Sequence, residues 1–258
     1  MFFTNMILFD LCVSAPLRAQ FHAKAQRRKV YCHYLDCWYE LRTVILFFML
    51  SFSSIRAQVS PETALIALKE GNSRFVAGKS IKPHQDVNRI KELATGQKPF
   101  AVIVGCSDSR VPSEIIFDQG LGDLFIVRTA GQVSSYASFG SVEFANAVLG
   151  AKLIVVLGHT QCGAVAAACK LPEVPGHIVS LINAIKPAAK LAKHQHGDEI
   201  ENAVKINVAM QVEQLKNLEP VLTKSTKDNS TMVVGAVYDL KTGKVEFLPE
   251  NYLSNLKS

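Results

Sequence analysis

The chain has 258 residues, 48% of them hydrophobic, and a formal net charge of +6. This length suffices for one substantial hydrophobic core and an extension. Most of the net positive charge lies before residue 58, and residues 58–258 contain nearly equal numbers of basic and acidic residues. The composition therefore gives no electrostatic reason to expect a nucleic-acid partner.

The first 57 residues divide into two parts. Residues 1–41 show no sustained helical or strand periodicity, and we predict an unstructured extension or a start codon assigned too early. Residues 42–57 have a positive flank, an apolar core and Ala57 as a cleavage point, which predicts a signal peptide. The alternative is a buried or membrane-surface helix, and the apolar segment is too short for a stable membrane span. We therefore expect a periplasmic or secreted protein, with a cytoplasmic location as the alternative.

The rest of the sequence, 58–258, predicts one folded domain. Apolar, mostly β-branched segments indicate buried strands, and segments with helical periodicity lie between them. The expected strands are 100–105, 124–128, 153–158, 231–239 and 244–248. One expected helix begins at Ser60, and the others cover 88–93, 138–149, 163–170, 178–192 and 199–218. This alternation predicts an α/β fold with a mainly parallel central β-sheet, covering helices and a C-terminal edge hairpin.

Two short polar motifs each follow a predicted strand. Cys106 comes directly after the first strand, and His159 and Cys162 come after the third. Because ligands bind at the carboxyl ends of strands in open α/β sheets, we expect these side chains at one edge. Two thiolates and an imidazole suit zinc, and three protein ligands leave an open position for water. The spare domain cysteine, Cys169, is predicted to pack in the core, so no disulfide framework is expected.

Asp108 and Arg110 lie two positions apart in the loop after the first strand. A guanidinium that holds a carboxylate by two hydrogen bonds keeps that carboxylate ionised. The carboxylate would then accept the proton of a metal-bound hydroxide, or would bind the metal itself and close the site. The alternative is that Asp108 caps the following helix and pairs with Arg110 at the surface.

The two motifs resemble those of a known family. Cys-Ser-Asp-Ser-Arg-Val at 106–111 and His-Thr-Gln-Cys-Gly at 159–163 together closely resemble the β-class carbonic anhydrases, and the resemblance covers about residues 60–252. It implies reversible hydration of CO2 to bicarbonate and a proton by metal-hydroxide attack. A carbonyl sulfide or carbon disulfide hydrolase on the same scaffold is the alternative. A non-catalytic zinc-binding module is a third possibility, which would need a fourth permanent ligand.

The resemblance also assigns individual residues and one Zn2+ per subunit. The metal ligands that it implies are Cys106, His159, Cys162 and, in a closed state only, Asp108. The catalytic residues that it implies are Asp108, Arg110 and Gln97. The substrate-binding residues that it implies are Gln97, Phe125 and Gly163. Gln97 would donate a hydrogen bond to substrate, and Phe125 would form an apolar wall. Phe144 stands where plant-like members have a tyrosine, and Gln132 stands where an asparagine is more usual. The family's fold implies a homodimer or higher homo-oligomer whose subunits share the active-site cleft.

Overall fold

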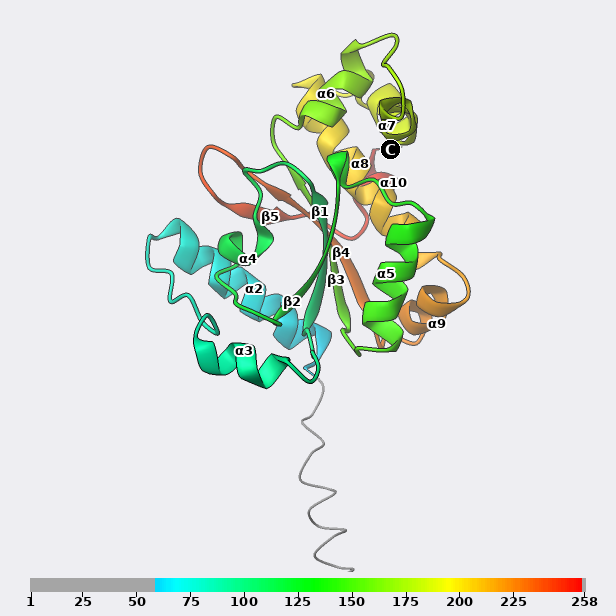
Figure 1. Ribbon diagram of the computed structural model, residues 1–258. Coiled ribbons are helices and arrows are strands. Elements are labelled where there is room, and N and C mark those ends of the chain that lie inside the picture. Colours follow the sequence, from blue (N-terminus) through cyan, green and yellow to red (C-terminus); the bar gives the residue numbers. More distant parts are fainter. Residues whose placement is uncertain (1–58, 257–258) are drawn as a thin grey trace, which may run out of the picture. The chain divides into compact units, whose positions relative to one another are not determined.

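The computed structural model describes residues 59–256, which form a five-stranded sheet between layers of helices (Figure 1). The strands are β1 (Ala101–Cys106), β2 (Leu124–Thr129), β3 (Leu153–His159), β4 (Met232–Tyr238) and β5 (Val245–Phe247). Their order is β2-β1-β3-β4-β5, with β1 to β4 parallel and β5 antiparallel to β4. This arrangement confirms the predicted α/β fold with its C-terminal edge hairpin. The predicted extension 1–41 and signal peptide 42–57 lie outside the described residues.

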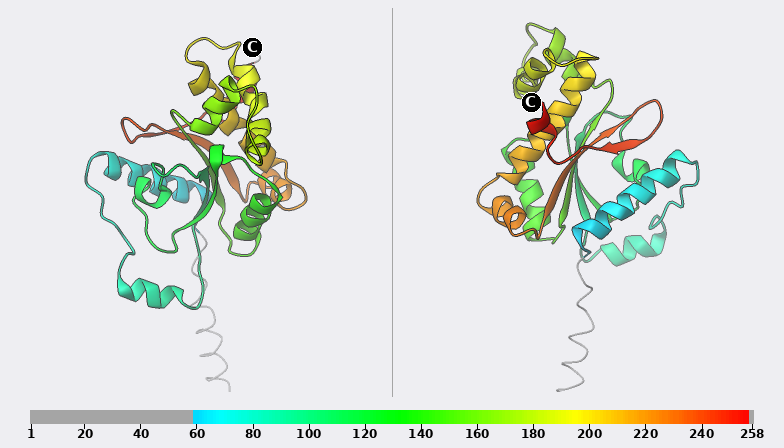
Figure 2. Two further views of the ribbon diagram at one scale, coloured as in Figure 1. Left: turned by 45° about the horizontal axis from the view of Figure 1, so that its top comes forward. Right: turned by 180° about the vertical axis from the view of Figure 1, so that it is seen from behind.

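Helices cover both faces of the sheet (Figure 2). The helical segments are α2 (Pro61–Val76), α3 (Val87–Leu93), α4 (Ser113–Ile116), the 3-10 helix η1 (Ala130–Gln132), α5 (Tyr136–Ala147), α6 (Gly163–Lys170), α7 (Ile178–Ala192), α8 (Glu199–Lys216), α9 (Val221–Lys227) and α10 (Tyr252–Asn255). The core of one face includes residues of α2 and α4, and the core of the other includes residues of α5 and α8. The sequence does not predict the short helices α4, α9 and α10, because segments of so few residues are too short to reveal a helical periodicity. None of the helices between residues 59 and 256 combines the length and the apolar character needed to cross a bilayer.

The central strands β1 and β3 are buried along their whole length. Successive side chains of a strand point to opposite faces, so each strand supplies two apolar clusters. Ile103 packs on the α2 side, whereas Val104 and Val156 pack on the α8 side. Burial on both faces explains why these segments are apolar almost without interruption. Because β1 and β3 are neighbours in the sheet, their carboxyl ends bring the two polar motifs together.

The helix α2 shows how closely the elements pack. It begins where the sequence predicts, with the Oγ atom of Ser60 accepting a hydrogen bond from the Thr63 amide at 3.2 Å. Gly71 lies inside α2 and is buried against the backbone of Phe117. A Cβ atom at position 71 would collide with the Phe117 carbonyl oxygen. The glycine therefore permits close contact between α2 and the segment after α4.

Candidate metal centre

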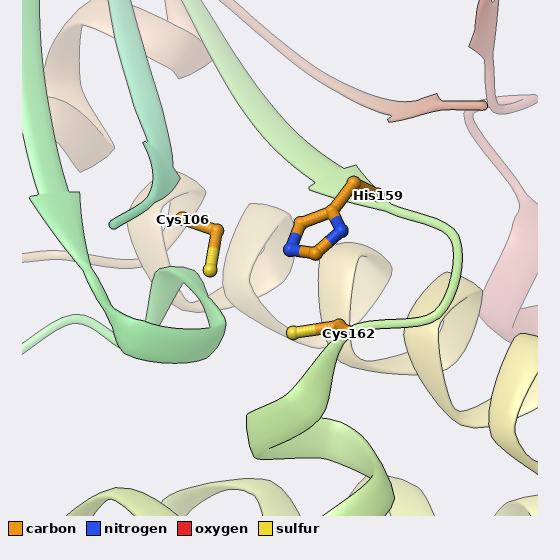
Figure 3. Close-up of side chains that lie close together, drawn as sticks. All are labelled: Cys106, His159 and Cys162. Atoms are coloured by element: carbon orange, nitrogen blue, oxygen red, sulfur yellow. The ribbon is translucent and has the colours of Figure 1, made fainter. Parts of the chain in front are cut away.

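Three side chains with metal-ligating atoms meet at the carboxyl edge of the sheet. Cys106 is the last residue of β1, His159 is the last residue of β3, and Cys162 directly precedes α6. Their side chains point into a common space (Figure 3), and the ligand atoms all lie within 4.8 Å of one another. All three residues are buried. The structure therefore brings together the three residues that the sequence predicts as ligands.

The imidazole of His159 is oriented for a metal. Its Nδ1 atom lies 2.9 Å from the carbonyl oxygen of Thr160 and donates a hydrogen bond to it. This bond places the proton on Nδ1 and leaves the lone pair on Nε2. Nε2 is buried and has no hydrogen-bond partner among the described residues. An unpaired buried nitrogen that faces two cysteine sulfurs fits a zinc ion with three protein ligands.

The pKa values of the ligands reflect a shared proton. A hydrogen bond from the Cys162 thiol lowers the pKa of Cys106 to about 4, although burial opposes the shift. The same hydrogen bond, together with burial, raises the pKa of Cys162. Burial disfavours protonation of His159, but the neighbouring Cys106 sulfur and its charge outweigh burial and raise the pKa of His159. Without metal the group holds one thiolate and one thiol near neutral pH, and a metal bound here would replace the thiol proton.

Asp108 and Arg110 form a two-point ion pair beside the ligands. The Nη2 atom of Arg110 lies 2.7 Å from Oδ2 of Asp108, and this oxygen lies 3.7 Å from Nε2 of His159. The hydrogen bond from Arg110 holds the pKa of the Asp108 carboxyl well below its usual range. Asp108 does not cap the next helix, because α4 begins after Pro112 without a side-chain cap. The alternative of a helix-capping aspartate is therefore wrong.

Two further side chains hold the ligand loops in place, and sequence reasoning missed both. Arg128 on β2 donates from Nε to the carbonyl oxygen of Cys106 at 2.8 Å and from Nη2 to that of Asp108 at 2.6 Å. Glu201 on α8 accepts a hydrogen bond from the Gln161 amide at 2.9 Å, and Gln161 has a positive φ of 54°. An arginine on an edge strand and a glutamate in the first turn of a helix are both common surface residues. The sequence therefore carries no local signal for either contact.

The residues assigned to substrate binding are not all near the ligands of their own chain. Gly163 is the first residue of α6 and adjoins Cys162. Gln97 is exposed and precedes β1, whereas Cys106 ends that strand, so about 16 Å of strand lies between them. Phe125 is the second residue of β2 and pairs with Val102 near the start of β1. Gln97 and Phe125 thus lie toward the opposite edge of the sheet from Cys106.

The metal-ligating group contains three residues rather than four. Among residues 59–256, Cys106, His159 and Cys162 form the one group of three or more His, Cys, Asp or Glu side chains close enough to hold a metal. Cys169 is partly buried and packs against the core on the α8 side of the sheet, as the sequence predicts. Burial raises the pKa of its thiol. A fourth cysteine ligand from the described part of the chain is therefore absent.

Comparison with known proteins gives consistent matches. A family model described as carbonic anhydrase matches residues 101–245. A carbonic anhydrase of Mycolicibacterium smegmatis is 41% identical over 191 residues, which cover 72% of this chain and 93% of that protein. Carbonic anhydrase 2 of Mycobacterium tuberculosis is 43% identical over 191 residues, which cover 72% of this chain and 91% of that protein. The segment matched by the family model includes all three candidate ligands.

Solved structures show the same architecture. A tetrameric β-carbonic anhydrase of Sordaria macrospora superposes with a TM-score of 0.59 at 26% identity, covering 68% of this chain and 93% of that one. A Coccomyxa β-carbonic anhydrase in complex with acetazolamide gives a TM-score of 0.57 at 26% identity, covering 74% of this chain and 86% of that one. The likeness therefore extends from the sequence to the fold.

Proposed function

The chain belongs to the β-carbonic anhydrase family, and on that premise we propose that it hydrates CO2 reversibly with one zinc ion per subunit, bound by Cys106, His159 and Cys162. The observation that carries this proposal is the unpaired Nε2 of buried His159, which faces two sulfurs and lies 3.7 Å from the carboxylate of Asp108. Bound zinc would supply a Lewis acid that makes water nucleophilic near neutral pH. The residues around it orient the nucleophile and the substrate.

Asp108 orients the nucleophile and does not store its proton. Its carboxylate accepts hydrogen bonds on both oxygens, and Arg110 keeps it ionised. Because its pKa lies far below neutral, Asp108 accepts a hydrogen bond at Oδ2 but does not retain a proton there at physiological pH. The proton of the reaction must therefore leave by another group or by water. A swing of Asp108 onto the metal would give a closed state.

Substrate contacts would involve two subunits. CO2 is small and apolar, so the Phe125 ring would provide a wall and the Gln97 amide a hydrogen-bond donor for the charge that develops on oxygen. Both residues lie away from the ligands of their own chain, which supports a contribution from the partner in a homodimer or higher oligomer. The Sordaria macrospora relative is tetrameric. Gly163 leaves room beside Cys162, because a Cβ atom at this position would meet no described atom within 4 Å apart from its chain neighbours and the backbone of its own helix.

Exposed apolar side chains support such an assembly. Five of them lie on α3, on α4 and on the adjoining loops: Ile81, Val87, Ile90, Ile115 and Leu121. The loop before α3, α3 itself and the loop after α4 contact each other, since the Leu121 amide donates to the His84 carbonyl at 3.1 Å and Arg89 donates to the Leu121 carbonyl at 3.0 Å. Apolar patches of this kind on soluble proteins mark contact surfaces. We propose that these side chains belong to the subunit interface.

The test is CO2 hydration by stopped flow, with zinc content measured on the same sample between roughly pH 6.5 and 9. We expect activity to track zinc and to rise with pH. Zinc-loaded protein that is inactive on CO2 throughout this range would overturn the proposal. Hydrolysis of carbonyl sulfide or carbon disulfide by that inactive protein would identify the alternative substrate class.

The location of the protein is a separate proposal. The positive flank and apolar core of residues 42–57 support export across the inner membrane and cleavage after Ala57. Mass spectrometry of the mature N-terminus, combined with cell fractionation of tagged full-length protein, tests this. A mature periplasmic protein beginning at Gln58 is expected. A cytoplasmic product that retains residues 42–57 would contradict it.

A further inference from the structure

The sulfur of Cys106 has a hydrogen-bond donor from outside its own loop. The backbone amide of Gly131 lies 3.3 Å from the Cys106 Sγ atom, and the contact is buried. A hydrogen bond to a thiolate withdraws electron density from the sulfur and restricts its orientation. The position of the Gly131 peptide therefore affects how strongly this sulfur donates electrons to a metal.

Gly131 adopts a conformation that depends on its surroundings. Its φ is +72°, and the next residue, Gln132, also has a positive φ of 47°. A Cβ atom at position 131 would lie 2.6 Å from the Cδ1 atom of Ile185, so close packing also excludes a side chain. Consecutive left-handed residues are uncommon and persist only where neighbouring groups hold them. The hydrogen-bond partner of the Gly131 carbonyl oxygen identifies the group that holds this turn.

A buried asparagine on α8 binds this carbonyl. Nδ2 of Asn207 donates to the Gly131 oxygen at 3.0 Å, and Asn207 is 1% exposed. One helical turn further on, Oε1 of Gln211 accepts a hydrogen bond from the Ser134 amide at 3.1 Å. Two buried amides on one face of α8 thus hold the segment 131–134. Of the two, Asn207 is the one that binds the residue in contact with the sulfur.

We infer that Asn207 is a positioning residue for the zinc thiolate of Cys106. By holding the Gly131 carbonyl, it keeps the Gly131 amide directed at Sγ. This inference rests on the proposed function, because it presumes that Cys106 is a zinc ligand.

The inference is tested with Asn207→Leu, which has similar volume and no donor. The carbonyl of Gly131 loses its partner, the turn relaxes, and the sulfur of Cys106 becomes richer in electrons. In protein loaded with Co2+ in place of zinc, the sulfur-to-cobalt charge-transfer absorption should then move to lower energy. Zinc affinity, measured by competition with a chromophoric chelator, should fall on the order of tenfold, because the sulfur loses the contact that restricts its orientation.

The matched control is Gln211→Leu. It removes another buried amide from the same helix and frees the other end of the same segment, so its loss of thermal stability should be similar. Its cobalt spectrum and zinc affinity should match those of the wild-type protein. An unchanged spectrum and affinity in Asn207→Leu would overturn the inference, and so would equal spectral shifts in both variants. Asn207→Ser, a smaller change, serves for the same comparison if Asn207→Leu does not fold.

The outcome also separates this inference from the proposed function. Wild-type protein that binds neither zinc nor cobalt at Cys106 contradicts both. Wild-type protein that binds metal and hydrates CO2, with Asn207 variants that keep its spectrum and affinity, contradicts only the role of Asn207.

Discussion

Arg110 binds both oxygens of the Asp108 carboxylate, with Nε 2.9 Å from Oδ1 and Nη2 2.7 Å from Oδ2. The guanidinium thereby fixes the plane of the carboxylate, and it keeps Oδ2 beside the imidazole of His159. An ionised carboxylate in a set orientation can align a nucleophile without binding the metal. This geometry allows the roles of Asp108 and the ligands to be tested separately.

Asp108→Ala should retain zinc and lose activity. The three ligands remain, while the group that orients the nucleophile is removed, so turnover should fall on the order of 100-fold. The measurement is stopped-flow hydration with zinc determined on the same protein. A variant that loses zinc but keeps wild-type activity per bound zinc would show that Asp108 supports the metal instead of the reaction.

Zinc uptake should release protons. The pKa of Cys162 is raised by the hydrogen bond to Cys106 and by burial, so this thiol is protonated near neutral pH and must lose its proton to bind metal. About one proton per zinc is expected where His159 is neutral, and more as the pH falls into the range where His159 is charged. Zinc affinity should therefore weaken toward low pH. Zinc added to apoprotein with a pH indicator measures the release directly, and a pH-independent affinity would contradict this assignment.

Gly71→Ala should destabilise the protein, although alanine is the better helix former. Its Cβ atom would meet the Phe117 carbonyl, which is backbone and cannot rotate away. We expect the free energy of unfolding to fall by about 3 kcal/mol. Gly140→Ala in α5 is the control, since its Cβ position has no described atom within 4 Å apart from its chain neighbours and the backbone of its own helix. This change should raise that free energy by about 0.5 to 1 kcal/mol. Urea denaturation of both variants measures these changes in the free energy of unfolding. Stabilisation by Gly71→Ala would show that the contact with Phe117 is not this close.

Asp118→Asn should destabilise the protein in a pH-dependent way. Asp118 is buried and accepts hydrogen bonds from Arg74 at 2.7 Å and from two backbone amides. Burial opposes its ionisation, but Arg74 and the amides lower its pKa. A lowered pKa stabilises the folded state above the unfolded pKa of about 3.9, and this stabilisation is lost as the pH falls through the folded pKa.

The free energy of unfolding of Asp118→Asn should therefore lie about 2 kcal/mol below that of the wild-type protein at pH 7. The gap should shrink below about pH 4. Chemical denaturation at several pH values measures it. Asp228→Asn, at an exposed aspartate, should show a much smaller gap. A gap that stays constant with pH would mean that the charge of Asp118 contributes nothing.

Several features of the candidate site could be predicted because they are local. The ligands follow apolar segments that are buried on both faces, and this pattern identifies strands of a parallel sheet. Asp108 and Arg110 are two residues apart, so their pairing needs no knowledge of distant elements. The roles of Gln97, Phe125 and Gly163 stay predictions, because they depend on contacts with a substrate and a second subunit.

The sequence by itself determined the fold class and the ligand set, because each buried strand and the residues at its end can be recognised within a short continuous segment. Only the tertiary structure decided what supports the ligands. The Gly131 amide donates a hydrogen bond to Cys106, which lies 25 positions away in the sequence. The Asn207 side chain donates to Gly131, which lies 76 positions away. Such contacts depend on how α8 packs against the sheet, and an asparagine within a helix gives no sign of its partner. The physical reason is that backbone periodicity is local, whereas the hydrogen bonds that orient a buried sulfur are satisfied by whichever distant group the packing brings close.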